Sequence, residues 1–206
     1  MTRGRFIVFE GPDRVGKSTQ VERLVAVLGA VATREPGGTA VGAEVRELLL
    51  DHRTDGLDPR AEALLMAADR AQHVAEVVAP ALAAGRHVVS DRYLYSSVAY
   101  QGAGRELGED RVRELSLWAV DGLEPDLVVL LDAADDPLAV RRPGDGDRLE
   151  REGDDFFARV GASYRRQAAA DPDRWVVVDA RADVEEVHRA VLAAVTARLE
   201  IEVGAR

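Results

Sequence analysis

Short apolar runs alternate with longer amphipathic segments along this chain of 206 residues, which predicts strands that alternate with helices. Five runs have the length and apolar content of buried strands, and they cover residues 6–9, 29–33, 87–91, 127–131 and 175–178. Helical spacing of apolar side chains extends over residues 20–28, 41–50, 59–79, 92–101, 110–120, 154–169 and 184–203. This alternation indicates an α/β fold, with a central five-stranded parallel sheet flanked by helices.

Glycine, proline and charged residues mark the segments between these elements. Pro80 is expected to kink or end the long helix, and a glycine loop is expected to extend through Gly104. Residues 139–153 are dense in charge, proline and glycine, so we expect an exposed, mobile loop there. The length suits a single domain, residues 1–206.

The first strand leads into a glycine-bounded loop, GPDRVGKS at residues 11–18, and helical spacing resumes after it. The loop matches the pattern G-x-x-x-x-G-K-[ST] of the phosphate-binding P-loop. Its glycines let the backbone approach a polyphosphate, and its amides direct partial positive charge toward the phosphates. A chance match in a glycine-rich turn is disfavoured by the strand before it and the helix after it. The pattern therefore predicts a three-layer P-loop NTPase fold. The expected ATP-binding residues here are Gly11, Pro12, Asp13, Arg14, Val15, Gly16, Lys17, Ser18 and Thr19.

Three residues suit the chemistry of phosphates and magnesium. Lys17 is the only lysine among 27 basic residues, and a compact ammonium group suits the space among phosphate oxygens. Asp91 ends an apolar strand, where this fold places a carboxylate that supports magnesium. An aspartate that only caps the next helix is the alternative. We expect Ser18 and Asp91 to be the Mg²⁺ residues.

Composition narrows the classes of function. The formal net charge of −10 argues against nucleic acid as a partner, so an anionic ligand must be held by local arginine clusters. The absence of cysteine excludes disulfides and thiolate chemistry, and the four histidines show no ligand-spaced pair. No apolar run approaches the roughly 20 residues of a membrane span, and we expect no signal peptide before the first strand. We expect a cytoplasmic enzyme with no membrane partner.

Several motifs resemble those of the thymidylate kinases. They are TREPGGT at residues 33–39, AADRAQ around Arg70, DRY starting at Asp91, SSVAYQG at residues 96–102 and DRLE at residues 147–150. Their order and spacing match along almost the whole chain, and together with the P-loop they are far more specific than one pattern. The resemblance implies a nucleoside monophosphate kinase that phosphorylates dTMP with ATP and Mg²⁺ and usually forms a homodimer. It also implies a short lid at residues 141–153.

The resemblance assigns the binding residues of this expected reaction. The implied dTMP-binding residues are Asp13, Glu35, Pro36, Arg46, Met66, Arg70, Arg92, Ser97, Tyr100 and Gln101. The arginines would face the acceptor phosphate and the thymine, and Glu35 and Pro36 would line the site. Ser97 and Gln101 would hydrogen-bond the base, Tyr100 would crowd the sugar 2′ position, and Asp13 would hold the 3′-hydroxyl region. Arg148 would lie over the adenine of ATP.

The catalytic residues implied by the resemblance are Arg14, Lys17, Arg92 and Arg142. The family has two arrangements of catalytic arginine, one in the P-loop and one in the lid. Arg14 follows the first arrangement, whereas TREPGGT and DRLE resemble the second. Since the lid candidate around Arg142 is short, we assign the main transition-state role to Arg14 and a helping role to Arg142.

Met66 departs from the family pattern, because it occupies the position of a phenylalanine that usually stacks on thymine. A thioether also packs on the face of a base, so we expect looser base selection.

Two alternatives stay open. The chain could be a P-loop kinase with an acceptor other than dTMP. It could also be a non-catalytic nucleotide-binding protein, although the complete set of Lys17, Ser18, Asp91 and Arg92 argues against that. A GTPase switch normally reads guanine with an N-K-x-D motif, and this chain contains no asparagine.

Overall fold

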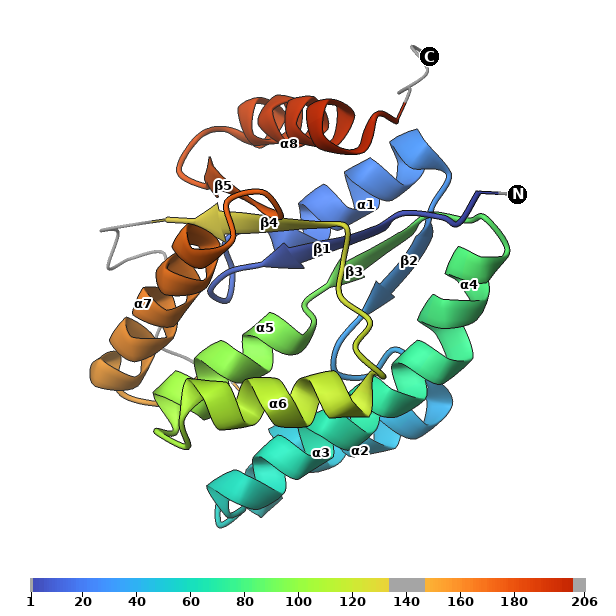
Figure 1. The fold of residues 1–206 in the computed structure, drawn as a ribbon. Helices are drawn as coiled ribbons and strands as arrows, with labels where there is room; N and C mark the ends of the chain where they lie inside the picture. Colours follow the sequence, from blue (N-terminus) through green and yellow to red (C-terminus); the bar gives the residue numbers. More distant parts are fainter. Residues whose placement is uncertain (1, 134–146, 202–206) are drawn as a thin grey trace.

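The computed structural model describes residues 2–133 and 147–201. A five-stranded parallel sheet lies at its centre, with the strand order β2-β3-β1-β4-β5 (Figure 1). The strands are β1 (Phe6–Glu10), β2 (Val31–Arg34), β3 (Val88–Asp91), β4 (Leu127–Asp132) and β5 (Trp175–Asp179). The α/β class and the five expected strands are confirmed.

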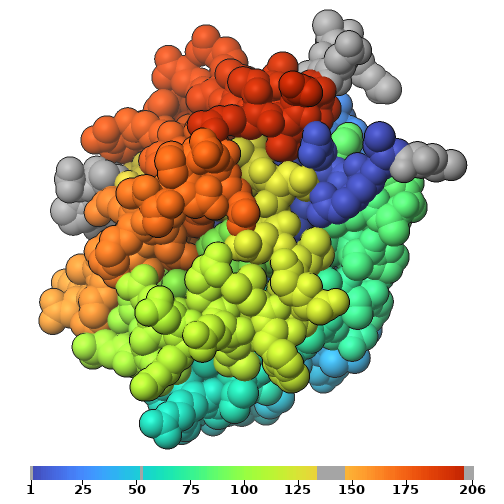
Figure 2. Space-filling model, in the orientation of Figure 1, coloured from blue at the N-terminus to red at the C-terminus, as the bar shows by residue number. Residues whose placement is uncertain are grey.

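Helices cover both faces of the sheet (Figure 1). One face carries α1 (Lys17–Leu28) and α8 (Val184–Leu199), and the other carries α5 (Leu94–Ser97), α6 (Glu109–Ala119) and α7 (Asp154–Ala170). On that second side, α2 (Ala40–Leu50) packs against α3 (Pro59–His73), and a 3₁₀ turn (His52–Thr54) joins them. Figure 2 shows α6 and α7 at the surface of this second side, where their side chains cover the sheet.

Alternate residues of β1 face the two opposite hydrophobic cores, as the pleat of a strand requires. Phe6 and Val8 pack in the core beneath α5 and α7, whereas Ile7 and Phe9 pack with α1 and α8. Every residue of β1 is buried, which explains why its sequence is a continuous apolar run that only Glu10 ends.

The expected helix over residues 59–79 is longer and less regular than its pattern predicts. After α3, a π-helical segment η2 (Val74–Val78) leads into α4 (Ala79–Ala83). Pro80 lies in the first turn of α4, where a missing backbone N–H is tolerated. Of the two expected effects of Pro80, a kink or an end of the helix, the end is wrong, because helical structure continues to Ala83.

The expected glycine loop through Gly104 is also wrong, because residues Val98–Gly104 form a second π-helical segment, η3. A Cβ on Gly104 would lie 2.5 Å from the ring of Phe156, and one on Gly102 would lie 3.0 Å from the Cα of Glu109. These glycines allow close packing of η3 against α6 and α7.

The expected loop at residues 139–153 lies largely outside the described residues, and Arg142 is among those outside. Its described end, residues 147–153, forms turns in which Arg148 and Leu149 are buried. Leu149 packs with Leu49 and Met66. The prediction of an exposed loop is thus wrong for this part, because its leucine and its ion pairs anchor it.

The carboxyl ends of β1 and β3 lie side by side, since Phe9 pairs with Asp91 across the two strands. The P-loop follows β1 and Arg92 follows β3, so both meet at the edge where such sheets bind ligands. Within the described ranges, we find no helix with the length and apolar character to cross a membrane.

Candidate active site

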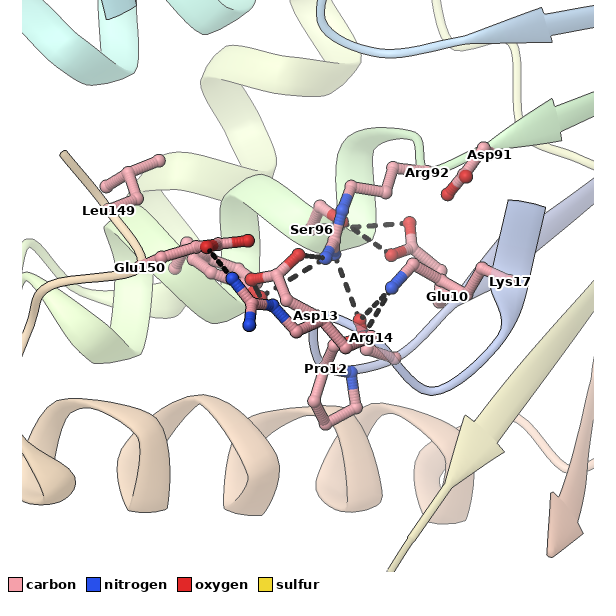
Figure 3. A network of polar contacts seen from close by, with 12 residues as sticks. Glu10, Pro12, Asp13, Arg14, Lys17, Asp91, Arg92, Ser96, Leu149 and Glu150 are labelled. Atoms are coloured by element: carbon pink, nitrogen blue, oxygen red, sulfur yellow. Dashed lines mark hydrogen bonds and ion pairs between the residues drawn. The ribbon is translucent and has the colours of Figure 1, made fainter. Parts of the chain in front are cut away.

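The P-loop fits tightly around the end of β1. Gly11 and Gly16 have φ angles of 137° and 90°, and a Cβ on Gly11 would lie 2.4 Å from the carbonyl oxygen of Leu131. Glycine avoids both the strain and the clash. The Nζ of Lys17, the first residue of α1, donates to the carbonyl oxygens of Gly11, at 3.1 Å, and Pro12 (Figure 3). Burial lowers the pKa of this ammonium group to about 8.

Ser18 and Asp91 meet at the mouth of the loop, where the Ser18 hydroxyl donates to a carboxylate oxygen of Asp91 at 2.7 Å. A hydroxyl and a carboxylate are the oxygen ligands that Mg²⁺ accepts, usually together with phosphates and water. The described residues contain no group of three or more histidine, aspartate or glutamate side chains arranged to hold a metal. One hydroxyl and one carboxylate leave most ligand positions to phosphate and water, so this pair fits a magnesium ion that binds with a nucleotide.

Arg92 lies between the P-loop and η3. Its guanidinium group pairs with Asp13 and donates to the carbonyl oxygen of Gly11 at 3.0 Å (Figure 3). Tyr100 donates its hydroxyl to the other oxygen of Asp13 at 2.9 Å. Burial alone would raise the pKa of Asp13, but the charges of Arg92 and Lys17 outweigh it and lower this pKa to about 2. Asp13 is therefore ionised at neutral pH and fixes the arginine over the loop.

Glu10, the last residue of β1, organises the groups around Arg92. It is fully buried and accepts hydrogen bonds from the backbone of Tyr93 at 2.9 Å, from the Ser96 hydroxyl at 2.6 Å and from the Tyr164 hydroxyl at 3.0 Å. The Ser96 and Tyr164 oxygens in turn each accept from Arg92 at 3.0 Å. Burial raises the pKa of Glu10 to about 6, although Arg92 opposes the shift.

Two pockets meet at this edge of the sheet. One is lined by all ten expected dTMP residues together with Leu50, Tyr93, Ser96, Asp147 and Leu149. The other is lined by Asp13, Arg14, Gly16, Lys17, Ser18, Thr19, Arg34, Glu35, Arg46, Asp91 and Arg92. Four residues line both pockets: Asp13, Glu35, Arg46 and Arg92. A phosphate-binding loop and a second arginine-lined pocket therefore adjoin, as transfer between two bound nucleotides requires.

Arg70 lies almost fully buried at the inner wall of the first pocket. Its Nε donates to Glu35 at 2.7 Å, and its terminal nitrogens donate to the hydroxyls of Ser116 at 3.1 Å and Ser97 at 2.9 Å. Glu35 also contacts Nδ1 of His73 at 2.8 Å. These contacts fix the guanidinium plane at the pocket.

Arg14 extends from the P-loop toward the turn at residues 147–153, where its guanidinium group pairs with Glu150 at 2.6 Å (Figure 3). Arg148 does not extend to the P-loop. Its buried side chain donates to Glu62 and, at 3.0 Å, to the carbonyl oxygen of Leu49. The buried carboxylate of Glu62 thus holds this guanidinium group in the structure, and the expected place of Arg148 over an adenine stays a prediction.

Several residues of the site were not expected from the sequence. They are Glu10, Glu62, Ser96, Glu150 and Tyr164. Only Glu10 carries a visible signal, because a glutamate at the end of an apolar run, directly before the P-loop, is buried by its position. The others depend on partners that are distant in the chain.

A P-loop at the end of the central strand, beside a second pocket lined with arginine, places the chain among the P-loop kinases of small phosphorylated molecules. The family model for thymidylate kinase matches residues 9–191. The chain belongs to the thymidylate kinase family and is a kinase.

Sequence relatives and a solved structure agree with this assignment. The chain is 58% identical to a thymidylate kinase of Leifsonia xyli subsp. xyli over 89% of this chain and 90% of the relative. It is 52% identical to a thymidylate kinase of Bifidobacterium longum, covering 91% and 95% of the two chains. It is also similar to the crystal structure of thymidylate kinase from Ehrlichia chaffeensis, with a TM-score of 0.78 and 29% identity over 94% of this chain and 99% of that one.

Proposed function

We propose that this protein transfers the γ-phosphoryl group of ATP to dTMP in the presence of Mg²⁺ and so forms dTDP for dTTP synthesis. The observation that carries the proposal is that the two pockets share four lining residues, Asp13, Glu35, Arg46 and Arg92. A donor in the P-loop pocket and an acceptor in the other would then meet at these shared side chains, where Arg92 is held by Asp13. The relatives are named thymidylate kinases, and this name indicates dTMP as the acceptor.

The chain's own residues would act mainly by positioning and by neutralising charge, because phosphoryl transfer needs little covalent chemistry from the protein. Lys17 would leave the carbonyl oxygens of the loop and bind the β- and γ-phosphate oxygens. Arg92, held by Asp13, would orient the acceptor phosphate for in-line attack. Arg14 would leave Glu150 and neutralise the charge that develops on the transferred group. The attacking phosphate oxygen is already an anion, so a strong general base is not required.

The Ser18 and Asp91 pair would hold Mg²⁺, which supplies positive charge to the phosphate oxygens when bound. Since the pair is already hydrogen-bonded, little rearrangement is needed to present both oxygens to the ion. Arg142 stays a proposed helper that lies outside the described residues.

The test is a coupled assay of ADP release with ATP, Mg²⁺ and a panel of dTMP, dUMP and dGMP. We expect dTMP to be the best acceptor, and we expect a Met66→Phe variant to increase the preference for dTMP over dUMP. If only a different monophosphate were phosphorylated, the proposed acceptor dTMP would be wrong. If nucleotides bound without any turnover, the protein would be a non-catalytic nucleotide-binding protein. An unchanged preference in Met66→Phe would refute looser base selection by Met66.

The proposal includes a homodimer in the cytoplasm. Large apolar side chains are exposed on three helices that pack together, at Val41 and Leu48 of α2, Leu64 of α3 and Trp118 of α6. Apolar exposure over neighbouring elements is typical of a protein interface.

A further inference from the structure

Glu62, on α3, gathers three donor side chains from two segments, η3 with its C-cap residue and the turn at residues 147–153, around one buried carboxylate. Its side chain is fully buried. One oxygen accepts from Nε2 of Gln101 at 2.8 Å and from Nε of Arg105 at 3.3 Å. The other accepts from Arg105 at 3.1 Å and from Arg148. The pocket wall at Gln101 and the turn that carries Arg148 are thus joined through this carboxylate.

The chemistry of Glu62 decides how the Gln101 amide is turned. A carboxylate only accepts hydrogen bonds, so the group of Gln101 that faces Glu62 must be the NH₂ group. The carbonyl oxygen Oε1 of Gln101 makes no hydrogen bond to a described residue. If this oxygen were fully buried, it would be counted among the buried atoms without a partner, and it is not, so it keeps some exposure. Since Gln101 lines the first pocket, this oxygen is the acceptor that the residue offers there.

Two other polar groups that line this pocket, Arg70 and the Ser97 hydroxyl, can donate to a ligand. Arg70 can only donate, and the Ser97 hydroxyl accepts from Arg70, which leaves the hydroxyl hydrogen free to donate. A thymine or uracil edge carries a ring N–H between two carbonyl oxygens. The Gln101 oxygen can accept from that N–H, and the donors Arg70 and Ser97 can bind the carbonyl oxygens. A cytosine edge presents an unprotonated ring nitrogen and an amino group, which would place acceptor against acceptor and donor against donor.

We propose that Glu62 is a specificity-determining positioning residue, which locks the Gln101 amide so that the pocket selects nucleotides with a ring N3–H, thymine or uracil, over those with a cytosine edge. This inference rests on the proposed function for the identity of the acceptor site. Glu62 itself touches no substrate and acts through Gln101. Sites built around a buried hydrogen bond reject the analogue that cannot make it far more strongly than apolar contacts do.

The test compares the Kd of dTMP with that of 5-methyl-dCMP by calorimetry, because the two ligands share ring size and methyl group and differ only at the N3 and C4 edge. Wild-type protein is expected to prefer dTMP. In Glu62→Gln, an amide faces Gln101 and permits either orientation, so the preference should fall about tenfold or more. Gln101→Met should lose the preference to a similar extent, and adding Glu62→Gln to Gln101→Met should change it no further.

Arg105→Gln is the matched control, since it removes a donor to Glu62 but leaves the carboxylate facing Gln101. It should lower the thermal midpoint and keep the preference. If Glu62→Gln fails to fold, the double variant Glu62→Gln with Arg105→Gln removes one charge of each sign and serves in its place. A purely structural role of Glu62 would weaken both ligands equally and overturn the proposal. So would an unchanged preference in Gln101→Met, or a wild-type protein that binds neither ligand.

Turnover separates this inference from the proposed function. Selective binding of dTMP that depends on Glu62, without phosphoryl transfer, would support the positioning role and refute the kinase activity. Phosphoryl transfer to dTMP, with a base preference that is the same in wild type and Glu62→Gln, would support the kinase activity and refute the positioning role.

Discussion

Arg92 and Arg14 both adopt the left-handed backbone conformation, with φ angles of 71° and 67°. For residues other than glycine this costs about 1–3 kcal/mol, and such strain concentrates at functional sites. The backbone N–H of Arg92 donates to the carbonyl oxygen of Phe9 at 2.8 Å, and the Ser90 hydroxyl donates to the carbonyl oxygen of Arg92 at 2.8 Å. These bonds hold the strained residue, so the guanidinium group points back over the P-loop.

Replacing Arg14 with alanine is expected to lower kcat by roughly 10³-fold and to raise the KM for ATP only slightly, because an arginine of this kind acts in the transition state. Steady-state kinetics with ATP and dTMP measure both effects. Arg23→Ala is the control, since Arg23 pairs with Glu185 on the surface. A large rise in KM with kcat preserved would remove Arg14 from the catalytic role.

The affinity for ATP should fall as the pH rises above about 8, the pKa to which burial lowers Lys17. The ammonium form predominates below that pH, and only this form attracts the phosphates. Each further pH unit should weaken binding up to about tenfold. Calorimetry between pH 7 and 9.5 measures this slope. Lys17→Arg should bind with no such slope, because a guanidinium group stays protonated; an equal slope in both proteins contradicts the assignment.

The P-loop residues and Asp91 could be predicted because a motif of fixed spacing carries them. Glu10 and Glu62 could not be predicted in the same way. The partners of Glu10 lie 86 residues away, at Ser96, and 154 residues away, at Tyr164. No local pattern reveals such contacts, since they arise only when the strands are ordered in the sheet.

At the scale of elements, the π-helical segment η3 places Tyr100 and Gln101 in the pocket wall. A π segment inserts an extra residue into a helical turn and is common at functional sites. The strands were predicted well, because burial on both faces leaves a continuous apolar run. The glycines of η3 indicated a loop in the sequence, since spacing alone does not show that Phe156 packs against them.

Gly104→Ala is expected to destabilise the protein by about 1–3 kcal/mol, because its Cβ would lie 2.5 Å from the Phe156 ring. Chemical denaturation measures the change. Gly161→Ala in α7 is the matched control, since no atom beyond its chain neighbours and the nearby backbone of its own helix lies within 4 Å of its added Cβ. This substitution should stabilise the helix by about 0.5–1 kcal/mol. Equal effects of the two substitutions would contradict the packing role of Gly104.

At the scale of the whole molecule, the parallel sheet brings segments from the two ends of the chain to one edge. Tyr164 of α7 reaches Glu10 of β1 there, and the turn at residues 147–153 closes over the pocket beside Met66. The strand order that produces this arrangement cannot be read from the sequence pattern, which indicates only that the strands are parallel.

The proposed homodimer should dissociate when Leu64→Glu and Trp118→Ser are combined, because these side chains are 58% and 81% exposed in the single chain. Sedimentation velocity at micromolar concentration measures the mass. Val184→Glu on α8 is the control, since this valine is 49% exposed on the opposite side of the sheet, and that variant should stay dimeric. A wild-type protein that sediments as a monomer refutes the dimer.

The burial of Lys17 has a practical consequence for measuring stability. A lysine-specific endoprotease has a single peptide bond to cut in the whole chain, the one after Lys17, and that bond lies in the first turn of α1. Digestion therefore needs the phosphate-binding loop and α1 to unravel. The rate at which two fragments appear on a gel therefore measures how often this one site opens. A ligand that binds the phosphate-binding loop should slow the cleavage.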